Sequence, residues 1–262
     1  MYTGPIMASF EIADVDPSNL DERGFFCATS KRNSMGYEEK LAWTRERFRD
    51  GLRIKVIARG GRGFIEYIPG RFAWRGIDAP GYMVIHCLCV AGRTRAKGSG
   101  KALLDACIHD ARQAGMYGVA AVTAHGKEGF VDTGFFVHHG FRVVQSTASE
   151  IDLVALKFQP ASADPCFIAD LKKKGRALSR GLTVISSPQC PFTYEGAQRI
   201  VALADADGIP VRSLRVNSLK QLRETSPSPY ASFDIVNGGE VVSHQFSCMT
   251  AGKLRKLVCG SK

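Results

Sequence analysis

The chain has 262 residues and a mass of 28.5 kDa, enough for two modest domains or one large one. Apolar residues make up 45% and charged residues 23%, which is ordinary for a globular fold and excludes a long disordered chain, a collagen-like fibre and a coiled coil. The net charge of +10 fits an ordinary basic protein, an anionic cofactor or a nucleic acid. The longest apolar stretch, Tyr82 to Ala91, is interrupted by His86 and is too short to span a membrane. The first residues lack the basic and apolar regions of a signal peptide, so we expect none.

The cysteine pattern indicates free thiols. Eight cysteines in 262 residues are far fewer than the roughly 8–10% of a disulfide scaffold. No Cys-x-x-Cys pair or zinc-type spacing occurs, so we expect no metal site. Cys87 and Cys89 lie in an apolar run and Cys107 lies on a helix face, which indicates buried thiols. These features favour a reducing cytoplasm.

Strands and helices alternate through the first part of the chain. Apolar residues recur at the helical period between Ser99 and Ala114, whereas they alternate with basic residues in Leu52–Ala58. In chain order we expect a strand over Phe10–Ala13, a helix over Tyr37–Arg49, strands over Leu52–Ala58, Phe64–Ile68 and Tyr82–Val90, a helix over Ser99–Ala114, a strand over Val119–Thr123, a short helix over Phe135–His139 and a strand over Phe141–Val144.

A stretch of small residues and prolines, Gln159–Pro165, has the composition of a linker. Further on, the turn Asn237-Gly238-Gly239 between two apolar runs predicts a β-hairpin. After the linker we expect, in chain order, a helix over Ile168–Leu178, a strand over Leu182–Ser186, a helix over Thr193–Asp207, a strand over Val211–Val216, a short helix over Ser218–Glu224, hairpin strands over Phe233–Val236 and Glu240–His244, and a helix over Thr250–Cys259.

The most informative stretch runs from a strand through a loop into a helix, between Leu88 and Leu104. Gly98 and Gly100 let a ligand approach the backbone, and the N–H groups that begin the helix face outward at the positive end of its dipole. Such a turn suits a pyrophosphate. Four basic residues surround it: Arg93, Arg95, Lys97 and Lys101. No Gly-Lys-Ser/Thr follows, which excludes a Walker A loop, and the dinucleotide fingerprint lacks its third glycine.

This turn resembles the Arg/Gln-x-x-Gly-x-Gly/Ala motif of the GNAT superfamily of acyl-CoA N-acyltransferases, which Arg95-Ala96-Lys97-Gly98-Ser99-Gly100 matches. The family's Leu-x-Val string is matched by Leu88-Cys89-Val90, and Phe135 to Phe141 resembles a second motif that ends in Gly-Phe. The likeness covers residues 8–158 and implies a twisted mixed sheet that splays after Tyr82–Val90, with acetyl-CoA in the split. It implies cofactor contacts at Leu88, Cys89, Val90, Arg95, Ala96, Lys97, Gly98, Ser99, Gly100 and Lys101.

The resemblance also implies direct transfer of an acetyl group from CoA to an amine. The amine must lose a proton and the departing thiolate must gain one. Many relatives carry a tyrosine at the position of Phe136, which has no proton to give, so another group or water must supply it. His86 is a candidate base if no bulge interrupts its strand, because His86, Leu88 and Val90 then share a face. Glu66, on the preceding strand, is the second candidate; a core histidine and a solvated carboxylate are the structural alternatives.

Other residues near the expected site allow two interpretations. His125 ends the next strand near the expected thioester, whereas His138 and His139 have the character of surface or packing residues. Between two strands, Trp74 and Arg75 either line a pocket for an amphipathic or anionic substrate or pack between the strands.

The second part of the chain contains a candidate reactive thiol. Cys190 precedes an expected helix, and a helix N-terminus lowers the pKa of a thiol. The order of elements resembles the thioredoxin fold, which carries a cis-proline where this chain has Pro229. Thr193 stands where that fold has a second cysteine, which excludes an internal dithiol cycle there. Cys248 can resolve a disulfide with Cys190 only if the fold brings the two together.

Both parts together resemble the YoaP-type N-acetyltransferases, a bacterial and archaeal family with a GNAT domain and a thioredoxin-like C-terminal domain. The resemblance is carried by Ala73-Trp74-Arg75, Val84-Ile85-His86-Cys87 and Cys190-Pro191-Phe192. It implies an α/β (α+β) fold, with a GNAT domain over residues 1–159 and a smaller thioredoxin-like domain with a leading basic helix over residues 160–262. The second domain is then either a binding or dimerisation module or a monothiol module.

The leading hypothesis is an acetyl-CoA-dependent N-acetyltransferase in the cytoplasm that acts on a small-molecule amine, without a metal or a membrane and with a homodimer as one option. The alternative is an acyl-CoA-binding sensor or interaction protein with weak or no catalysis, which the missing tyrosine favours. Nucleic-acid binding is disfavoured, because the chain lacks an RNA-reading aromatic motif and a basic helix-turn-helix, and CoA accounts for part of the positive charge.

Overall fold

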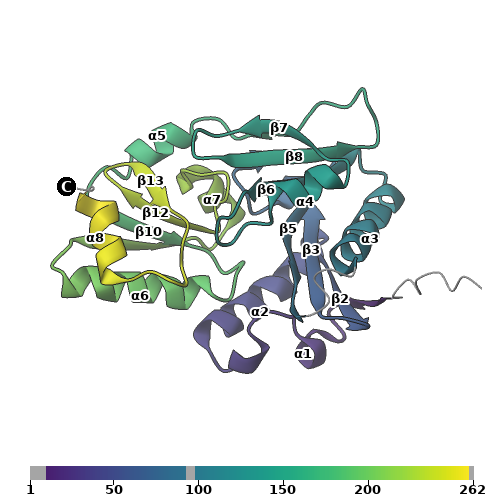
Figure 1. Ribbon diagram of the computed structural model, residues 1–262, viewed down its shortest axis with the longest axis horizontal. Coiled ribbons are helices and arrows are strands. Elements are labelled where there is room, and N and C mark those ends of the chain that lie inside the picture. The colour runs from purple at the N-terminus through teal and green to yellow at the C-terminus, as the bar shows by residue number, and fades with distance from the viewer. Residues whose placement is uncertain (1–9, 93–97, 260–262) are drawn as a thin grey trace, which may run out of the picture.

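The computed structural model describes residues 10–92 and 98–259, and Figure 1 shows two sheets that lie side by side. The first sheet has seven strands and the second has four. The strands are β1 (Glu11–Val15), β2 (Arg53–Arg59), β3 (Gly63–Pro69), β4 (Ile77–Asp78), β5 (Tyr82–Val90), β6 (Gly118–Ala124), β7 (Arg142–Ser146), β8 (Ile151–Lys157), β9 (Cys166–Phe167), β10 (Leu182–Ser186), β11 (Val211–Arg215), β12 (Phe233–Asn237) and β13 (Glu240–Ser243). The α-helices are α1 (Leu20–Arg23), α2 (Met35–Arg47), α3 (Ser99–Gln113), α4 (Thr133–His138), α5 (Leu171–Arg176), α6 (Thr193–Ala206), α7 (Leu219–Thr225) and α8 (Ala251–Cys259).

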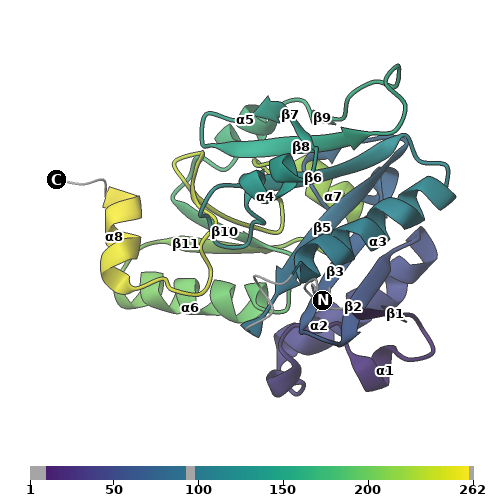
Figure 2. The same ribbon diagram turned by 45° about the vertical axis from the view of Figure 1, so that its right-hand side comes forward.

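The seven-stranded sheet has the order β1-β2-β3-β5-β6-β8-β7. Its neighbours are antiparallel except for β5 and β6, which run parallel. The apolar stripe of α3, with Leu103, Leu104 and Cys107, packs on one face of this sheet together with α4. Tyr37 and Trp43 of α2 pack on the other face (Figure 2). The sheet therefore forms the middle layer of three, as the implied mixed sheet with flanking helices requires.

A β-bulge in β5 changes which side chains face α2. Glu66 of β3 pairs with Cys87 and Tyr67 pairs with Ile85, so His86 is an extra residue without a partner on β3. A bulge of this kind turns two successive side chains toward the same face. Consequently His86 and Cys87 both lie on the α2 side. The prediction that His86, Leu88 and Val90 share a face is wrong, because it assumed a strand without a bulge.

The strands β5 and β6 separate at the same point. They pair only over Tyr82–Ile85 of β5, although β5 continues to Val90 and stays paired with β3 to its end. Beyond Ala121, β6 continues to Ala124 and remains paired with β8. The sheet thus splits between the second half of β5 and the end of β6, as the resemblance implied.

The four-stranded sheet has the order β11-β10-β12-β13, with β10 parallel to β11 and antiparallel to β12. Helices α6 and α8 pack on one face, through Ile200 and Leu254. The other face contributes Ile185 and Val236, and α7 contributes Leu222, to the same hydrophobic core as Trp43 and Trp74 of the first half. The two sheets therefore share a continuous core.

Polar contacts also join the two halves of the chain, which are the residues up to 159 and the residues from 160 on. The short strand β4 pairs with β9, and the Gly76 N–H donates to the Pro229 carbonyl at 2.9 Å. Arg215 forms an ion pair with Glu39. The predicted linker Gln159–Pro165 is held as well, since the Tyr82 hydroxyl donates to the Ala163 carbonyl at 2.9 Å.

Most elements lie close to their predicted positions, and β5 and β10 have the predicted bounds. The sequence reading missed α1, β4, β8 and β9. The apolar run of β8, with Ile151, Leu153 and Val154, was an available signal for a strand. The two-residue strands β4 and β9 carry no such signal, because they exist through their mutual pairing.

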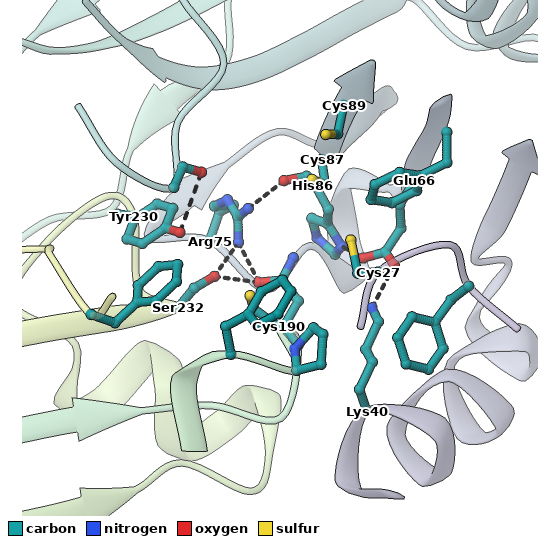
Figure 3. Close-up of a pocket in the computed structure, with 17 residues that line it drawn as sticks. Cys27, Lys40, Glu66, Arg75, His86, Cys87, Cys89, Cys190, Tyr230 and Ser232 are labelled. Atoms are coloured by element: carbon teal, nitrogen blue, oxygen red, sulfur yellow. Dashed lines mark hydrogen bonds and ion pairs between the residues drawn. The ribbon is translucent and has the colours of Figure 1, made fainter. Parts of the chain in front are cut away.

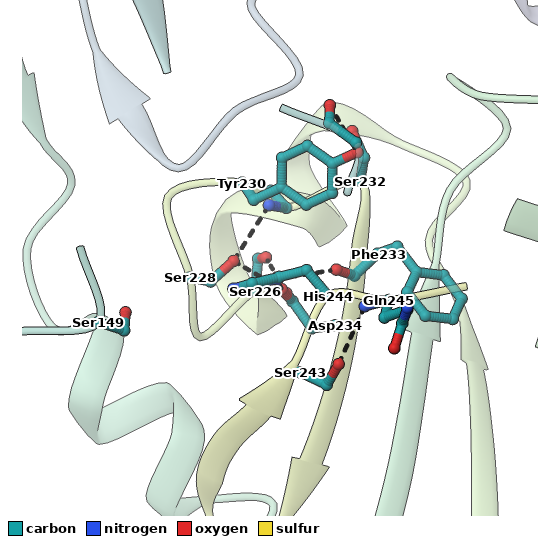
Figure 4. A network of polar contacts seen from close by, with 12 residues as sticks. Ser149, Ser226, Ser228, Tyr230, Ser232, Phe233, Asp234, Ser243, His244 and Gln245 are labelled. Atoms are coloured by element: carbon teal, nitrogen blue, oxygen red, sulfur yellow. Dashed lines mark hydrogen bonds and ion pairs between the residues drawn. The ribbon is translucent and has the colours of Figure 1, made fainter. Parts of the chain in front are cut away.

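A buried carboxylate holds the loop that precedes β12 (Figure 4). Asp234 accepts hydrogen bonds from Ser228 Oγ at 2.6 Å and Ser226 Oγ at 3.2 Å, and its Oδ1 lies 2.9 Å from His244 Nδ1. The rings of Tyr230 and His244 meet edge to face, with centroids 5.5 Å apart. This network fixes the position of Tyr230 relative to the second sheet.

Replacement of Asp234 by alanine should destabilise the protein by about 3 kcal/mol, because several buried polar groups lose their shared partner. Urea unfolding followed by circular dichroism measures this change. Asp205→Ala, at an exposed position on α6, is the matched control and should stay within about 0.5 kcal/mol of the wild type. Equal stability of Asp234→Ala and the wild type would contradict the assigned role.

Candidate functional site

A cavity of about 190 Å³ lies at the junction of the two halves (Figure 3). The first half lines it with residues of α2, β3, β5 and the segment before α2, and the second half with residues before α6, before β12 and after β13. Phe64 and Glu66 of β3 line it beside Cys87 and Cys89 of β5. These four are cross-strand partners on one face, so the bulge sets this wall of the cavity.

A buried row of charged and polar groups lies at one side of the cavity. Lys40 Nζ lies 2.5 Å from Glu66 Oε2, and the two side chains are 3% and 2% exposed. His86 Nδ1 lies 3.4 Å from Glu66 Oε1. The ammonium of Lys40 also lies over the Trp43 ring, 4.1 Å from its centroid.

The charge states of this row follow from its contacts. Burial alone would raise the pKa of Glu66, but Lys40 and His86 outweigh burial and lower that pKa to about 2. Burial lowers the pKa of His86 to about 4, although Glu66 opposes the change. At neutral pH Glu66 is therefore ionised and His86 is neutral.

The hydrogen bonds of His86 define its tautomer. The backbone N–H of Trp74 donates to His86 Nε2 at 3.0 Å, so Nε2 carries the lone pair and Nδ1 carries the proton. That proton is on the nitrogen nearest to Glu66. Since the lone pair of His86 is already bonded to the backbone, the geometry favours a positioning role for His86 beside Glu66.

The sequence placed Trp74 and Arg75 between two strands, either at a pocket or in the packing. Arg75 lines the cavity and Trp74 does not. Trp74 is 1% exposed and packs edge to face on Trp43, with ring centroids 5.5 Å apart. Arg75 lies beside Tyr230, with its guanidinium carbon 5.2 Å from the ring centroid, and donates to Ser232 Oγ at 2.7 Å. Arg75 thus fits the interpretation as a pocket residue, and Trp74 fits the interpretation as a packing residue between strands.

The residues expected to hold the cofactor lie around the split in the sheet. Leu88 and Val90 face the α3 side, whereas Cys89 faces the cavity. Gly98 precedes α3 with a φ of +83°, and a Cβ placed there would have no heavy atom of the described residues within 4 Å. Ser99 is buried, and Gly100 lies against Phe135. The remaining predicted contacts Arg95, Ala96 and Lys97 lie outside the described residues.

Lys101 lies in the first turn of α3, where it forms an exposed ion pair with Asp105 at 2.5 Å. Phe136 is fully buried and packs on Phe141, with ring centroids 5.0 Å apart. His125 is exposed and lies 3.3 Å from Asp132, away from the cavity. Phe136 and His125 therefore lie outside the cavity lining.

Four thiols line the cavity: Cys27, Cys87, Cys89 and Cys190. Burial raises the pKa of Cys190 and outweighs the backbone N–H of Phe192, so the prediction of a lowered pKa is wrong. Burial also raises the pKa values of Cys27 and Cys87. Cys248 is exposed and is not among the cavity residues. The described chain has no cis peptide bond, so Pro229 does not have the cis geometry that the thioredoxin resemblance implied.

The sequence reading missed several cavity residues. Lys40 follows Tyr37 at a helical spacing, so a charge on the buried face of α2 was the available signal. Gln189, Tyr230 and Ser232 had no such signal, because only the packing of the two halves brings them to Glu66 and His86. Cys27 had none either, because it lies in a turn without a regular apolar pattern.

Two further features concern metals and membranes. Across residues 10–92 and 98–259, no group of three or more His, Cys, Asp or Glu side chains is arranged to hold a metal ion. None of the helices in the same part of the chain is long and apolar enough to cross a membrane.

Cys190 should react slowly with iodoacetamide at neutral pH, because a raised pKa leaves little thiolate. Exposed Cys166 is the internal reference and should be labelled at least about tenfold faster. Mass spectrometry of peptides from a time course measures both rates in one sample. Labelling of Cys190 as fast as that of Cys166 would restore it as a reactive thiol.

Comparisons with known proteins show the family of the chain. The model of the acetyltransferase (GNAT) family matches residues 18–141. The uncharacterized N-acetyltransferase YoaP of Bacillus subtilis (strain 168) is 30% identical over 247 residues, which cover 94% of this chain and 97% of that protein. A GNAT family acetyltransferase from Brucella melitensis, solved in complex with acetyl-CoA, is 16% identical with a TM-score of 0.41, over 62% of this chain and 97% of that one. The PaiA N-acetyltransferase of Thermoplasma acidophilum, solved with coenzyme A, is 16% identical with a TM-score of 0.40, over 57% of this chain and 99% of that one. From the extent of the match to YoaP, the chain belongs to the GNAT family of N-acetyltransferases.

Proposed function

We propose that the protein transfers the acetyl group of acetyl-CoA to the amine of a small molecule bound in the cavity. The observation that carries this proposal is that the second half of β5 borders both the split in the sheet and the cavity. A donor in the split and an acceptor in the cavity would meet at this strand. Membership of an acetyltransferase family favours catalysis over the alternative of a sensor that only binds acyl-CoA.

The residues around the split fit acetyl-CoA. From His86 to Val90, β5 continues beyond its pairing with β6, which suits main-chain contacts to an extended pantetheine. The open space at Gly98 and the first turn of α3 suit a pyrophosphate. Among the described residues, the main chain of Leu88 and Val90 and the turn at Gly98 and Gly100 would hold the donor.

The cavity side supplies the acceptor chemistry. Acetyl-CoA supplies the acetyl group as an activated thioester. Ionised Glu66 is proposed to accept a hydrogen bond from the acceptor amine. This bond would orient the lone pair of the amine nitrogen toward the acetyl carbon. Lys40 keeps Glu66 ionised, and His86 holds it in place. Since Phe136 brings no proton, water is assigned to protonate the departing thiolate.

For the second part of the chain, we propose a thioredoxin-like unit over residues 160–262 that closes the acceptor side of a GNAT unit over residues 1–159. The order of strands and helices and the order β11-β10-β12-β13 support this proposal. The free cysteines of the described chain support a cytoplasmic location, because disulfides are rare in that compartment.

Gly98→Val should weaken acetyl-CoA binding by at least about tenfold, because a branched side chain fills the space at the start of α3. Gly115→Val is the matched control: it also has a positive φ and open surroundings, at the other end of the same helix. Isothermal titration calorimetry should give the control an affinity within about threefold of the wild type. Equal affinities of all three proteins would place the cofactor elsewhere.

Glu66→Gln should lower kcat by about 10- to 100-fold without changing acetyl-CoA affinity, because a charged hydrogen bond to the amine is lost. Since the pKa of Glu66 is about 2, the acid limb of the pH–rate profile should stay where it is in the wild type, set by the amine itself. Thiol release measured from pH 5 to 9 tests both points.

The single change leaves Lys40 buried without a counterion, so the double variant Lys40→Met/Glu66→Gln serves as the control for folding. It should fold and be as slow as Glu66→Gln. Wild-type turnover in a folded double variant would remove Glu66 from the mechanism.

A further inference from the structure

Arg75 is a buried cation for which the described part of the chain provides no counterion. Its side chain is 4% exposed, and it forms no ion pair with any carboxylate in the described chain. Two other buried charges lie beside an opposite charge, Lys40 beside Glu66 and Asp110 beside Lys55, and Asp234 accepts hydrogen bonds from Ser226 and Ser228. A buried charge is costly unless an opposite charge accompanies it. Arg75 is therefore the exception that requires an explanation.

Neutral groups satisfy only part of this guanidinium. Nη1 donates to the Trp74 carbonyl and to Ser232 Oγ, and it also contacts Gln189 Oε1. Nη2 donates to the His86 carbonyl at 2.6 Å. Within residues 10–92 and 98–259, the Nε–H has no acceptor. These bonds fix the direction of the side chain, but they leave its positive charge without a partner.

The charges of the described residues that line the cavity add up to one positive charge. Lys40 and Glu66 cancel each other, and His86 is neutral at pH 7 because burial lowers its pKa to about 4. Arg75 then adds an unbalanced cation to a site that is largely closed to water. A ligand with one negative charge would balance the site.

We propose that Arg75 receives the carboxylate of the acetyl acceptor, and that the acceptor is a short amino carboxylate with an apolar side chain, such as a small α-amino acid. This inference rests on the proposed function and assigns its substrate class.

The positions of the two recognition groups support a short separation between amine and carboxylate. Figure 3 shows Arg75 and Glu66 on opposite sides of His86. Arg75 donates to the carbonyl of His86, while Nδ1 of the same residue faces Glu66. One residue thus separates the group that holds the carboxylate from the group that holds the amine.

The walls and the size of the cavity indicate the rest of the acceptor. Four phenylalanines line it: Phe25, Phe64, Phe192 and Phe246. An apolar side chain is the natural complement of such walls. At about 190 Å³, the cavity is smaller than the roughly 300–1,000 Å³ of pockets for drug-sized ligands.

The reacting form of the acceptor carries the charge that balances the site. An amino acid attacks as a neutral amine with an ionised carboxylate, which carries one negative charge and balances Arg75. The amine nitrogen forms a bond to the acetyl carbon, the carbon–sulfur bond breaks, the nitrogen releases one proton and the thiolate takes one up. The products are an N-acetyl amino acid and CoA.

The test compares acceptors that differ only in the carboxylate. Leucine, methionine and phenylalanine are each assayed against the corresponding amino-acid amide, with acetyl-CoA in excess and thiol release as the readout. We expect kcat/KM for at least one amino acid to exceed that for its amide by about 10- to 100-fold, the range of a charged hydrogen bond. Turnover of the amides at an equal or higher rate overturns the carboxylate assignment and leaves acetyl transfer standing. Absence of transfer to either series overturns both.

Variants at Arg75 distinguish recognition of the carboxylate from a purely structural role, in which Arg75 only holds the two halves together. Arg75→Met should bring the ratio of acid to amide close to one, whereas Arg75→Lys should keep a clear preference for the acid. A purely structural role would lower the rates with the amino acid and with its amide together. The ratio of the two rates would then stay unchanged, which would contradict the proposal. Exposed Arg71→Met is the matched control, and its ratio should equal that of the wild type.

Discussion

The cavity depends on a single additional residue in β5. Because His86 has no partner on β3, the strand turns both His86 and Cys87 toward α2 and sends Leu88 and Val90 to the opposite side. The local cost of an unpaired residue in a sheet is offset by the contacts of His86 with Trp74 and Glu66. At the same residue β5 parts from β6. One irregularity thus orders the polar row and begins the split in the sheet.

The two halves complete the site together. The first half provides Lys40, Glu66 and His86, which hold one another in defined charge states. The second half covers these groups with Tyr230 and Phe246 and anchors Arg75 through Ser232. This cover keeps water away from the charges, so that each ion pair acts more strongly than it would on the surface. The hydrophobic core that continues across both sheets keeps the cover in place.

Features of the fold and the site could be predicted from the sequence where neighbouring residues in the chain determine them, and not where contacts between distant segments do. Most helices and strands followed from apolar periodicity, and the glycine turn before α3 followed from its spacing. The bulge at His86 could not be read, because it arises from the pairing of β5 with β3 rather than from composition. The pKa of Cys190 was misjudged for a similar reason: its position before a helix is local, whereas the burial that dominates comes from the first half of the chain. Arg75 was recognised as a candidate, but its missing counterion is visible only when its neighbours are known.

The division of the lining residues between the two halves has an evolutionary consequence. The glycine turn and the edge of β5 belong to the first half, whereas Phe192, Tyr230 and Phe246 line the cavity from the second. A substitution among these three reshapes the cavity and leaves the turn before α3 unchanged. With the acceptor in the cavity and the donor at the turn, as proposed, acceptor preference can diverge among descendants of this chain while binding of a common acyl donor is inherited unchanged.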